Sequence, residues 1–495
     1  MEIDSSSSSK KDEKSWGMIG ALAAKIRADL WNIAKNVKKV GEDDPRRISH
    51  SAKVGLALTI VSLLYYFRPL YNGFGQSGMW AILTVVVVFE FTVGGTISKC
   101  INRGFATLIA GALGIAAERF ASLCGQKGDP IVLGILVFLL AAGATFVRFF
   151  PVIKKRYDYG VLIFILTFSL VTVSGYRVEE IFELAHQRIS TILIGAATCM
   201  IISVFIRPVW AGEDLHNLII SNIEKLATFL LQGFGGENVQ VLPKSNDYKS
   251  VLGTKATEES LANFAWWEPG HGCFGFCHPW KQYLKIGAIT RECASQIEVL
   301  HCLKYSHPKT QQTGLQKMIT TSCERMRFET GMALKEIASS LKERIRLSSA
   351  FETHVQNSNS AMNELASVLD KFSLNQIGGR GGTLAEIVQV IAAASVLAEI
   401  IKNVERLSES ANELAKRARF KAPADHDKHD HQHQQPPEKS HIILHLGSVK
   451  PVSDDVDHVI IPVRGIVTRE EEPGMGNREI CPPNKPVFSL SLTVG

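Results

Sequence analysis

The sequence predicts an all-α membrane protein, with six transmembrane helices followed by a cytosolic helical domain. Two observations support this fold class. Hydrophobic residues form 46% of the 495-residue chain, and long apolar segments are concentrated between residues 51 and 210. After residue 211, apolar residues instead recur at spacings of three and four, which is typical of amphipathic helices in a bundle.

The first 50 residues are expected to form a cytosolic N-terminal segment. Residues 1–15 lack the apolar core of a secretory signal peptide, and they are expected to be disordered. The stretch from Trp16 to Val40 is expected to form a basic amphipathic helix, suited either to an anionic inner leaflet or to solvent. Pro45 breaks this helix, and two arginines follow it directly before the first apolar segment.

The transmembrane domain is expected to cover residues 51–210. Each of its six apolar segments is close to the ~20 residues that a helix needs to cross ~30 Å of hydrocarbon. The expected spans are roughly 51–68, 79–97, 100–118, 130–147, 159–175 and 189–207. The second and third spans are expected to meet at Gly94-Gly95, so that the third span carries Lys99 and Arg103.

Lysine and arginine residues set the expected orientation, because cationic loops remain in the cytosol. One side of the six spans collects the N-terminal cluster with Lys53, Lys99, Arg103, Arg148, Lys154, Lys155, Arg156 and Arg207. The other side has Arg68, Arg119, Lys127, Arg177 and Arg188. Both termini are therefore expected in the cytosol. Since the third span starts inside and the sixth starts outside, Arg103 and Arg188 should lie toward opposite membrane faces.

Residues 211–420 are expected to form the cytosolic helical domain. Helices are expected at 213–234, 279–303, 316–370 and 384–414, with a polar connection at 235–258 and an aromatic, turn-rich stretch at 263–280. From residue 421 the composition turns to Asp, His, Gln and Pro, so that the tail 421–495 is expected to be disordered.

The informative residues are the cations within the apolar segments, because a charge near the bilayer centre costs about 3 kcal/mol on insertion scales and normally faces a cavity. Arg103 and Arg188 are the strongest candidates for an anion path, since a guanidinium can hold a carboxylate through two hydrogen bonds. Lys99 would attract anions at the inner mouth. Lys99, Arg103, Thr107 and Gly111 share one helix face. The alternative is that these side chains only reach toward lipid head groups.

Glu90 is the only carboxylate within the second expected span. It can pair with Lys99, Arg103 or Lys53 and hold the spans together, or it can carry a proton. Pairing is the favoured interpretation.

Several function classes are disfavoured. The net charge of +6 is too small to indicate nucleic-acid binding. The nine cysteines are odd in number and irregularly spaced, which argues against a disulfide framework. The sequence has no phosphate-binding loop, zinc-protease motif or nucleophile elbow, so that neither catalysis nor a cofactor is expected. The glycine run at 378–382 lacks the lysine of a phosphate-binding loop, which disfavours an ATP-driven pump.

Acidic residues on the outer side could bind a hard multivalent cation, or they could simply be solvated: Asp129, Glu179, Glu180 and Glu183. No metal site is predicted with an ordinary ligand spacing. Cys273, Cys277 and His278 lack a fourth ligand, and the histidines between 426 and 433 lie in the tail.

Several motifs closely resemble the plant aluminium-activated malate transporters, a family of aromatic acid exporter-like anion channels. They are Asp44-Pro45-Arg46-Arg47, Met79-Trp80-Ala81, the stretch VVVFEF within 85–91, Arg148-Phe149-Phe150-Pro151, Pro208-Val209-Trp210-Ala211-Gly212-Glu213-Asp214-Leu215 and Trp267-Glu268-Pro269. The resemblance extends from about residue 42 to 420.

The resemblance implies a homodimeric channel with six spans per subunit that passes malate and smaller inorganic anions passively. The family's pore arginines match Arg103 and Arg188. Aluminium-responsive members carry acids on their outer loops, and the loop 68–78 has none, although Glu179 and Glu183 remain. Aluminium activation therefore stays open.

The sequence thus favours a passive channel for malate efflux, at the plasma membrane rather than the vacuolar membrane. The alternatives are a proton-coupled organic-acid exporter that uses Glu90 and a membrane-anchored helical scaffold.

Overall fold

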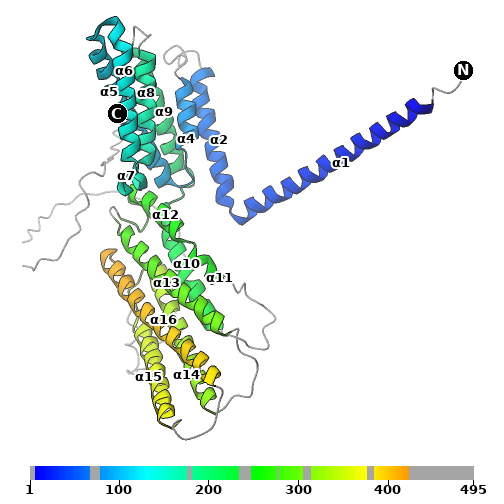
Figure 1. Ribbon diagram of the computed structural model, residues 1–495, viewed down its shortest axis with the longest axis vertical. Coiled ribbons are helices and arrows are strands. Elements are labelled where there is room, and N and C mark those ends of the chain that lie inside the picture. The colour runs from blue at the N-terminus through cyan, green and yellow to red at the C-terminus, as the bar shows by residue number, and fades with distance from the viewer. Residues whose placement is uncertain are drawn as a thin grey trace, which may run out of the picture. The chain divides into compact units, whose positions relative to one another are not determined.

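The computed structural model describes residues 6–66, 78–175, 181–232, 247–275, 278–304, 314–375 and 384–422, all within one compact unit. These residues are almost entirely α-helical, and the only β-structure in the same ranges is two isolated bridges (Figure 1). The helices are α1 (Ser6–Asp43), α2 (Pro45–Tyr66), α4 (Met79–Val88), α5 (Val93–Ser122), α6 (Gly125–Val147), α7 (Pro151–Arg156), α8 (Asp158–Gly175), α9 (Ile181–Phe205), α10 (Ala211–Gln232), α11 (Asp247–Leu252), α12 (Lys255–Trp267), α13 (Trp280–Lys304), α14 (Gly314–Glu343), α15 (Ser349–Asn375) and α16 (Leu384–Arg417).

Helix α5 is the centre of the apolar bundle and contacts α6, α8 and α9, while α4 packs against α2 and α9. Small residues allow these close approaches. A Cβ added to Gly114 would lie 2.7 Å from Val171 on α8, and one added to Gly195 would lie 2.8 Å from the carbonyl oxygen of Ala81 on α4. Helix packing in membranes commonly uses such small residues, because apolar side chains gain little from leaving lipid.

The bundle has the apolar exterior of an integral membrane protein. Three helical segments are long and apolar enough to cross a bilayer: Val93–Ser122, Gly128–Val147 and His186–Phe205. Two shorter apolar helical segments, Met79–Val88 and Asp158–Val173, accompany them. Large apolar side chains such as Phe138 and Phe146 are exposed on α6. Together with α2, these helices occupy the six stretches expected from the sequence, and the number of true spans remains a prediction.

The second span was predicted at 79–97, and its predicted end lies beyond the observed end of the helix. Helix α4 stops at Val88, and α5 starts at Val93, so that Gly94 and Gly95 lie in the first turn of α5 rather than between two spans. Two hydroxyls produce this break. The Thr92 side chain accepts a hydrogen bond from Gly95 N, and the Thr96 hydroxyl accepts one from Glu90 N at 3.0 Å.

The N-terminal region also differs from expectation. Helix α1 already begins at Ser6, so that the disorder expected for residues 1–15 is wrong for 6–15. Helix α2 begins at Pro45, before the expected start of the first span at residue 51. Proline suits a first helical position, where its missing N–H is not needed, and the Asp44 carboxylate accepts a hydrogen bond from Arg46 N at 3.0 Å.

Helices α10 to α16 surround a second hydrophobic core that includes Leu215, Ile219, Tyr283 and Ile286. The expected helix 316–370 is two helices, because the chain turns between Glu343 and Ser349 with Arg344 in the left-handed region at φ 55°. Helices α11 and α12 occupy parts of the stretches expected to be a polar connection and aromatic turns. The tail from 423 onward lies outside the described residues.

Candidate functional site

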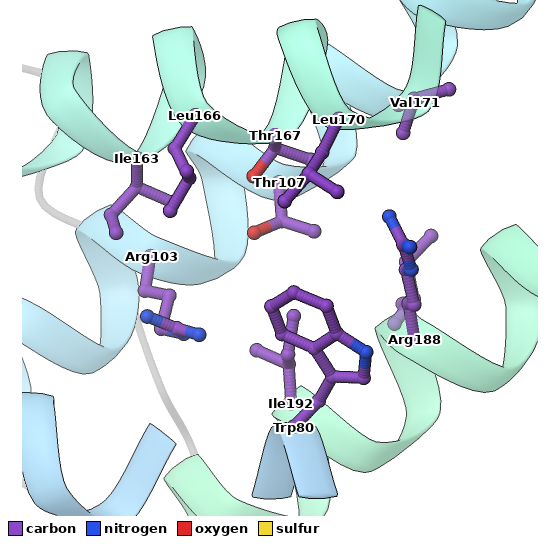
Figure 2. A pocket seen from close by; sticks show the side chains of 12 residues that line it. Trp80, Arg103, Thr107, Ile163, Leu166, Thr167, Leu170, Val171, Arg188 and Ile192 are labelled. Carbon is purple, nitrogen blue, oxygen red and sulfur yellow. The ribbon is translucent and has the colours of Figure 1, made fainter. Parts of the chain in front are cut away.

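A narrow pocket of about 30 Å³ lies between α4, α5, α8 and α9, in the apolar bundle (Figure 2). Its lining is apolar apart from two arginines, two threonines and the indole of Trp80. The lining residues are Trp80, Arg103, Thr107, Gly111, Ile163, Leu166, Thr167, Leu170, Val171, Arg188, Ile189 and Ile192. Figure 2 shows Arg103 and Arg188 on opposite sides of the Trp80 ring.

Arg103 is buried in this pocket, with only 3% of its surface exposed. Its Nη1 donates a hydrogen bond to the Tyr159 hydroxyl at 3.3 Å. Within the described part of the chain its buried Nε has no hydrogen-bond partner, and no carboxylate pairs with it. A buried cation without a counter-charge is costly, so that Arg103 is suited to receive an anion.

Arg188 reaches the same pocket from α9. Its guanidinium carbon lies 4.9 Å from the centroid of the Trp80 ring, which is a cation–π geometry. Its Nε is also buried, and it has no hydrogen-bond partner among the described residues. The pocket thus holds two permanently charged groups that both retain unused N–H donors.

Thr107 follows Arg103 by one helical turn, and its buried hydroxyl lacks a partner in the ranges that the structure covers. Figure 2 shows the hydroxyls of Thr107 and Thr167 close to the space between the arginines. Only part of the helix face expected to carry Lys99, Arg103, Thr107 and Gly111 therefore lines the pocket. Arg103, Thr107 and Gly111 line it, whereas Lys99 does not.

Lys99 instead forms an ion pair with Glu90. Its ammonium group also lies 3.5 Å from the Val87 carbonyl oxygen and 5.5 Å from the centroid of the Tyr159 ring. Of the three cations considered as partners for Glu90, the structure selects Lys99. Lys53 is buried elsewhere and donates a hydrogen bond to the Arg207 carbonyl at 2.9 Å.

Of the residues proposed for an outer cation site, Glu179 and Glu180 lie outside the described residues, as does the side chain of Glu183. Asp129 lies in α6, and one of its carboxylate oxygens is buried with no hydrogen-bond partner among the described residues. The described residues contain no group of three or more His, Cys, Asp or Glu side chains that could hold a metal ion. Cys273 is exposed, Cys277 is outside the described ranges, and His278 lies 3.4 Å from the Tyr283 hydroxyl.

Sequence reasoning did not find a role for Glu268, although it noted the Trp267-Glu268-Pro269 motif. The carboxylate is 4% exposed and accepts three backbone hydrogen bonds, from Gly94 N at 3.2 Å, Ala211 N at 2.6 Å and Gly212 N at 3.0 Å. It thereby caps α5, which carries Arg103, and α10 at the same time. Burial raises the pKa of Glu268 to about 7, although these three donors oppose the rise.

Nothing in a single sequence marks Trp80 and Thr167 as pocket residues, because a tryptophan or threonine in an apolar segment is compatible with many positions. The acid between Trp267 and Pro269 was the available clue for Glu268, since a helix C-terminus rarely favours a buried carboxylate.

Comparison with known proteins gives a consistent result. The family model described as aluminium activated malate transporter matches residues 38–380. The chain is 45% identical to aluminum-activated malate transporter 2 of Arabidopsis thaliana over 442 residues, covering 86% of this chain and 84% of that protein. It is 41% identical to aluminum-activated malate transporter 1 of Triticum aestivum over 432 residues, covering 82% and 90% of the two chains. The chain therefore belongs to the aluminium-activated malate transporter family.

Proposed function

We propose that this protein is a passive anion channel that carries malate, and smaller inorganic anions, out of the cytosol of a plant cell. The observation that carries the proposal is the pocket in which Arg103 and Arg188 both present unused guanidinium donors. Relatives named as malate transporters support malate as the substrate.

The chemistry of the pocket suits a dicarboxylate. Each guanidinium can form two parallel hydrogen bonds to one carboxylate, and Thr107 can donate a further one. Neither charge can be lost by deprotonation, so that the attraction persists across the physiological pH range. The described pocket has room for only one or two water molecules. Malate therefore passes only when side chains such as Trp80 move apart.

A passive mechanism fits the acidic residues better than proton coupling does. No carboxylate is found among the described residues that line the pocket. Glu90 pairs with Lys99 outside the lining, where it neutralises a cation and joins the α4–α5 connection to α5.

The proposal includes a topology. Helices α2, α4, α5, α6, α8 and α9 are the six spans of the domain 51–210, and both termini are cytosolic. Residues 211–420, with helices α10 to α16, form a cytosolic domain beyond them. The active form is a homodimer in the plasma membrane, and an outer site with Glu179 and Glu183 is the proposed location of any aluminium response.

Charge neutralisation tests the pore. Arg103→Gln and Arg188→Gln are each expected to lower malate current about tenfold or more, because a hydrogen bond to a charged group contributes roughly 1.5–3 kcal/mol. The measurement is whole-cell current in cells loaded with malate or chloride, normalised to surface protein. Arg119→Gln is the matched control, since Arg119 is exposed near the other end of α5. Normal current in both pocket variants would reject the proposed pore.

A proton-coupled organic-acid exporter is the second candidate, because Glu90 is a carboxylate between two apolar helices. Reversal potentials separate the two functions. A channel follows the anion gradient alone, so that at pH values where malate stays fully ionised its reversal potential should not depend on pH or on Glu90→Gln. A pH-dependent reversal potential that Glu90→Gln abolishes would instead support the exporter.

A further inference from the structure

Helix α1 has an apolar stripe that no other described residue covers. Its members are between 47% and 66% exposed: Ile26, Leu30, Ile33, Val37 and Val40. Their spacing of four, three, four and three places them on one side of the helix. A stripe of this size in contact with water is unfavourable, so that it requires a partner surface.

The rest of the same helix is strongly basic. Between residues 25 and 40 the other sides carry Lys25, Arg27, Lys35, Lys38 and Lys39, with Asp29 as the single acid. Trp31, which is 74% exposed, lies on this basic side of the helix rather than on the stripe. An apolar stripe opposite a side rich in lysine and arginine is the pattern of a helix that lies in the interface of an anionic bilayer.

The position of α1 in the chain favours the same partner. Only Asp44 separates its last residue, Asp43, from the start of α2. The joint is held because Arg46 donates hydrogen bonds to Asp44 and, at 2.7 Å, to Asp214 of α10. The outer residues of α2, including Leu56, Ile60 and Leu63, are exposed as in a helix that faces lipid. A helix joined so closely to a membrane span remains near the bilayer surface.

We propose that α1 is a membrane-surface anchor that binds the anionic lipid of the cytosolic leaflet. The proposal rests on the cytosolic N-terminus of the proposed function. A coiled coil with a second copy would use the same stripe, but the flanking positions do not suit it. Of these positions only Arg27 and Asp29 are charged, whereas Ala34, Asn36 and Gly41 are not. A coiled coil would also leave Lys35, Lys38 and Lys39 on its outer side without a partner surface.

Site-directed spin labels in the full-length protein test the anchor. A nitroxide at Val37→Cys reports on the apolar stripe, and one at Asn32→Cys on the opposite side is the matched control. All other cysteines are replaced by serine. The protein is placed in nanodiscs of phosphatidylcholine, with or without phosphatidylserine, and accessibility to oxygen and to a water-soluble relaxing agent is measured.

With phosphatidylserine, the Val37 label should become accessible to oxygen and protected from the aqueous agent, while the Asn32 label should remain in water. Each cation contributes about fivefold to binding near an anionic surface. The variant Lys35→Gln/Lys38→Gln/Lys39→Gln should therefore weaken the lipid-bound state by roughly a hundredfold.

A Val37 label that stays in water in both nanodiscs would overturn the anchor, and so would close label-to-label distances between two copies. Because nanodiscs expose both leaflets, the measured accessibility of the labels does not depend on the orientation of the protein or on anion passage. Anion current measured separately therefore distinguishes failure of the anchor from failure of the channel.

Discussion

Glu268 shows how one side chain can serve two helices. Its two carboxylate oxygens accept from Gly94 at the start of α5 and from Ala211 and Gly212 at the start of α10. Helix N-termini favour a negative charge, whereas burial disfavours it. Burial dominates, because the pKa of Glu268 is raised to about 7 from the ordinary value of 4.5. The Glu268 carboxyl group, which connects the starts of α5 and α10, is thus expected to change its protonation state near pH 7.

The raised pKa predicts a pH-dependent stability. The folded protein holds the Glu268 proton more tightly than the unfolded chain does, so that protonation of Glu268 increases the free energy of unfolding. This stabilisation is complete below pH 4.5 and is lost as pH rises through 7. Its full size is about 3 kcal/mol. The thermal midpoint of the purified full-length protein should fall between pH 5 and 8 more steeply than that of Glu268→Gln.

Infrared spectroscopy offers a direct check of the same group. A protonated carboxyl band should vanish with a midpoint near pH 7 in the wild type and in the control Glu259→Gln, which alters an exposed residue of α12, but it should be missing in Glu268→Gln. A Glu268 carboxyl that is already ionised at pH 5 would contradict the prediction.

At the scale of residues, the sequence could identify charges but not their surroundings. Arg103 and Arg188 were evident because a cation is rare in an apolar segment, and the structure brings both to one pocket. Lys99 has the same sequence signal, yet Glu90 pairs with it away from that pocket. The difference depends on which way the chain turns at 89–92, and a charge pattern does not contain that information.

At the scale of elements, the start of α5 packs closely against the α10–α16 helices. Gly94 faces the backbone carbonyl of Phe264 on α12, and Val93 N donates to the Val209 carbonyl at 2.9 Å. The sequence predicted most helices, because the helical spacing of apolar residues continues over a long stretch in each of them. It predicted the end of the second span too late in the chain. Apolar residues continue through 89–93, so that hydropathy cannot reveal where Thr92 begins a new helix.

The close packing at the start of α5 predicts that alanine substitutions at two of its glycines have different effects on stability. A Cβ at Gly94 would collide with backbone atoms of Phe264, which cannot rotate away, so that Gly94→Ala should destabilise the protein by about 1–3 kcal/mol. Gly104 has open space around it, and Gly104→Ala should be neutral or stabilise the helix by up to about 1 kcal/mol.

Thermal midpoints of the purified full-length variants measure both effects. Gly94→Ala should lower the midpoint and Gly104→Ala should not. Equal midpoints for the two variants would show that α5 and α12 are not packed as closely as described.

At the scale of the whole molecule, the distribution of cations and the order of the helices support the proposed topology. Lys53, Lys99 and Arg207 belong to the ends of α2, α5 and α9 that the positive-inside rule assigns to the cytosol. With a cytosolic N-terminus and six spans, the turn between α5 and α6 must face outward. The chain then returns to the cytosol after α9, where α10 begins.

Native cysteines can test this topology without added tags. Cys124 is exposed at the turn between α5 and α6, whereas Cys302 is exposed on α13. A membrane-impermeant maleimide applied to intact cells should modify Cys124 at once and Cys302 only after permeabilisation, as read by peptide mass spectrometry. Cys100, Cys199 and Cys293 are buried and should react only after unfolding, which makes them internal controls. Labelling of Cys302 but not of Cys124 in intact cells would reverse the orientation. Equal labelling of both cysteines in intact cells would place them on the same side of the membrane, which requires an even number of spans between them instead of three.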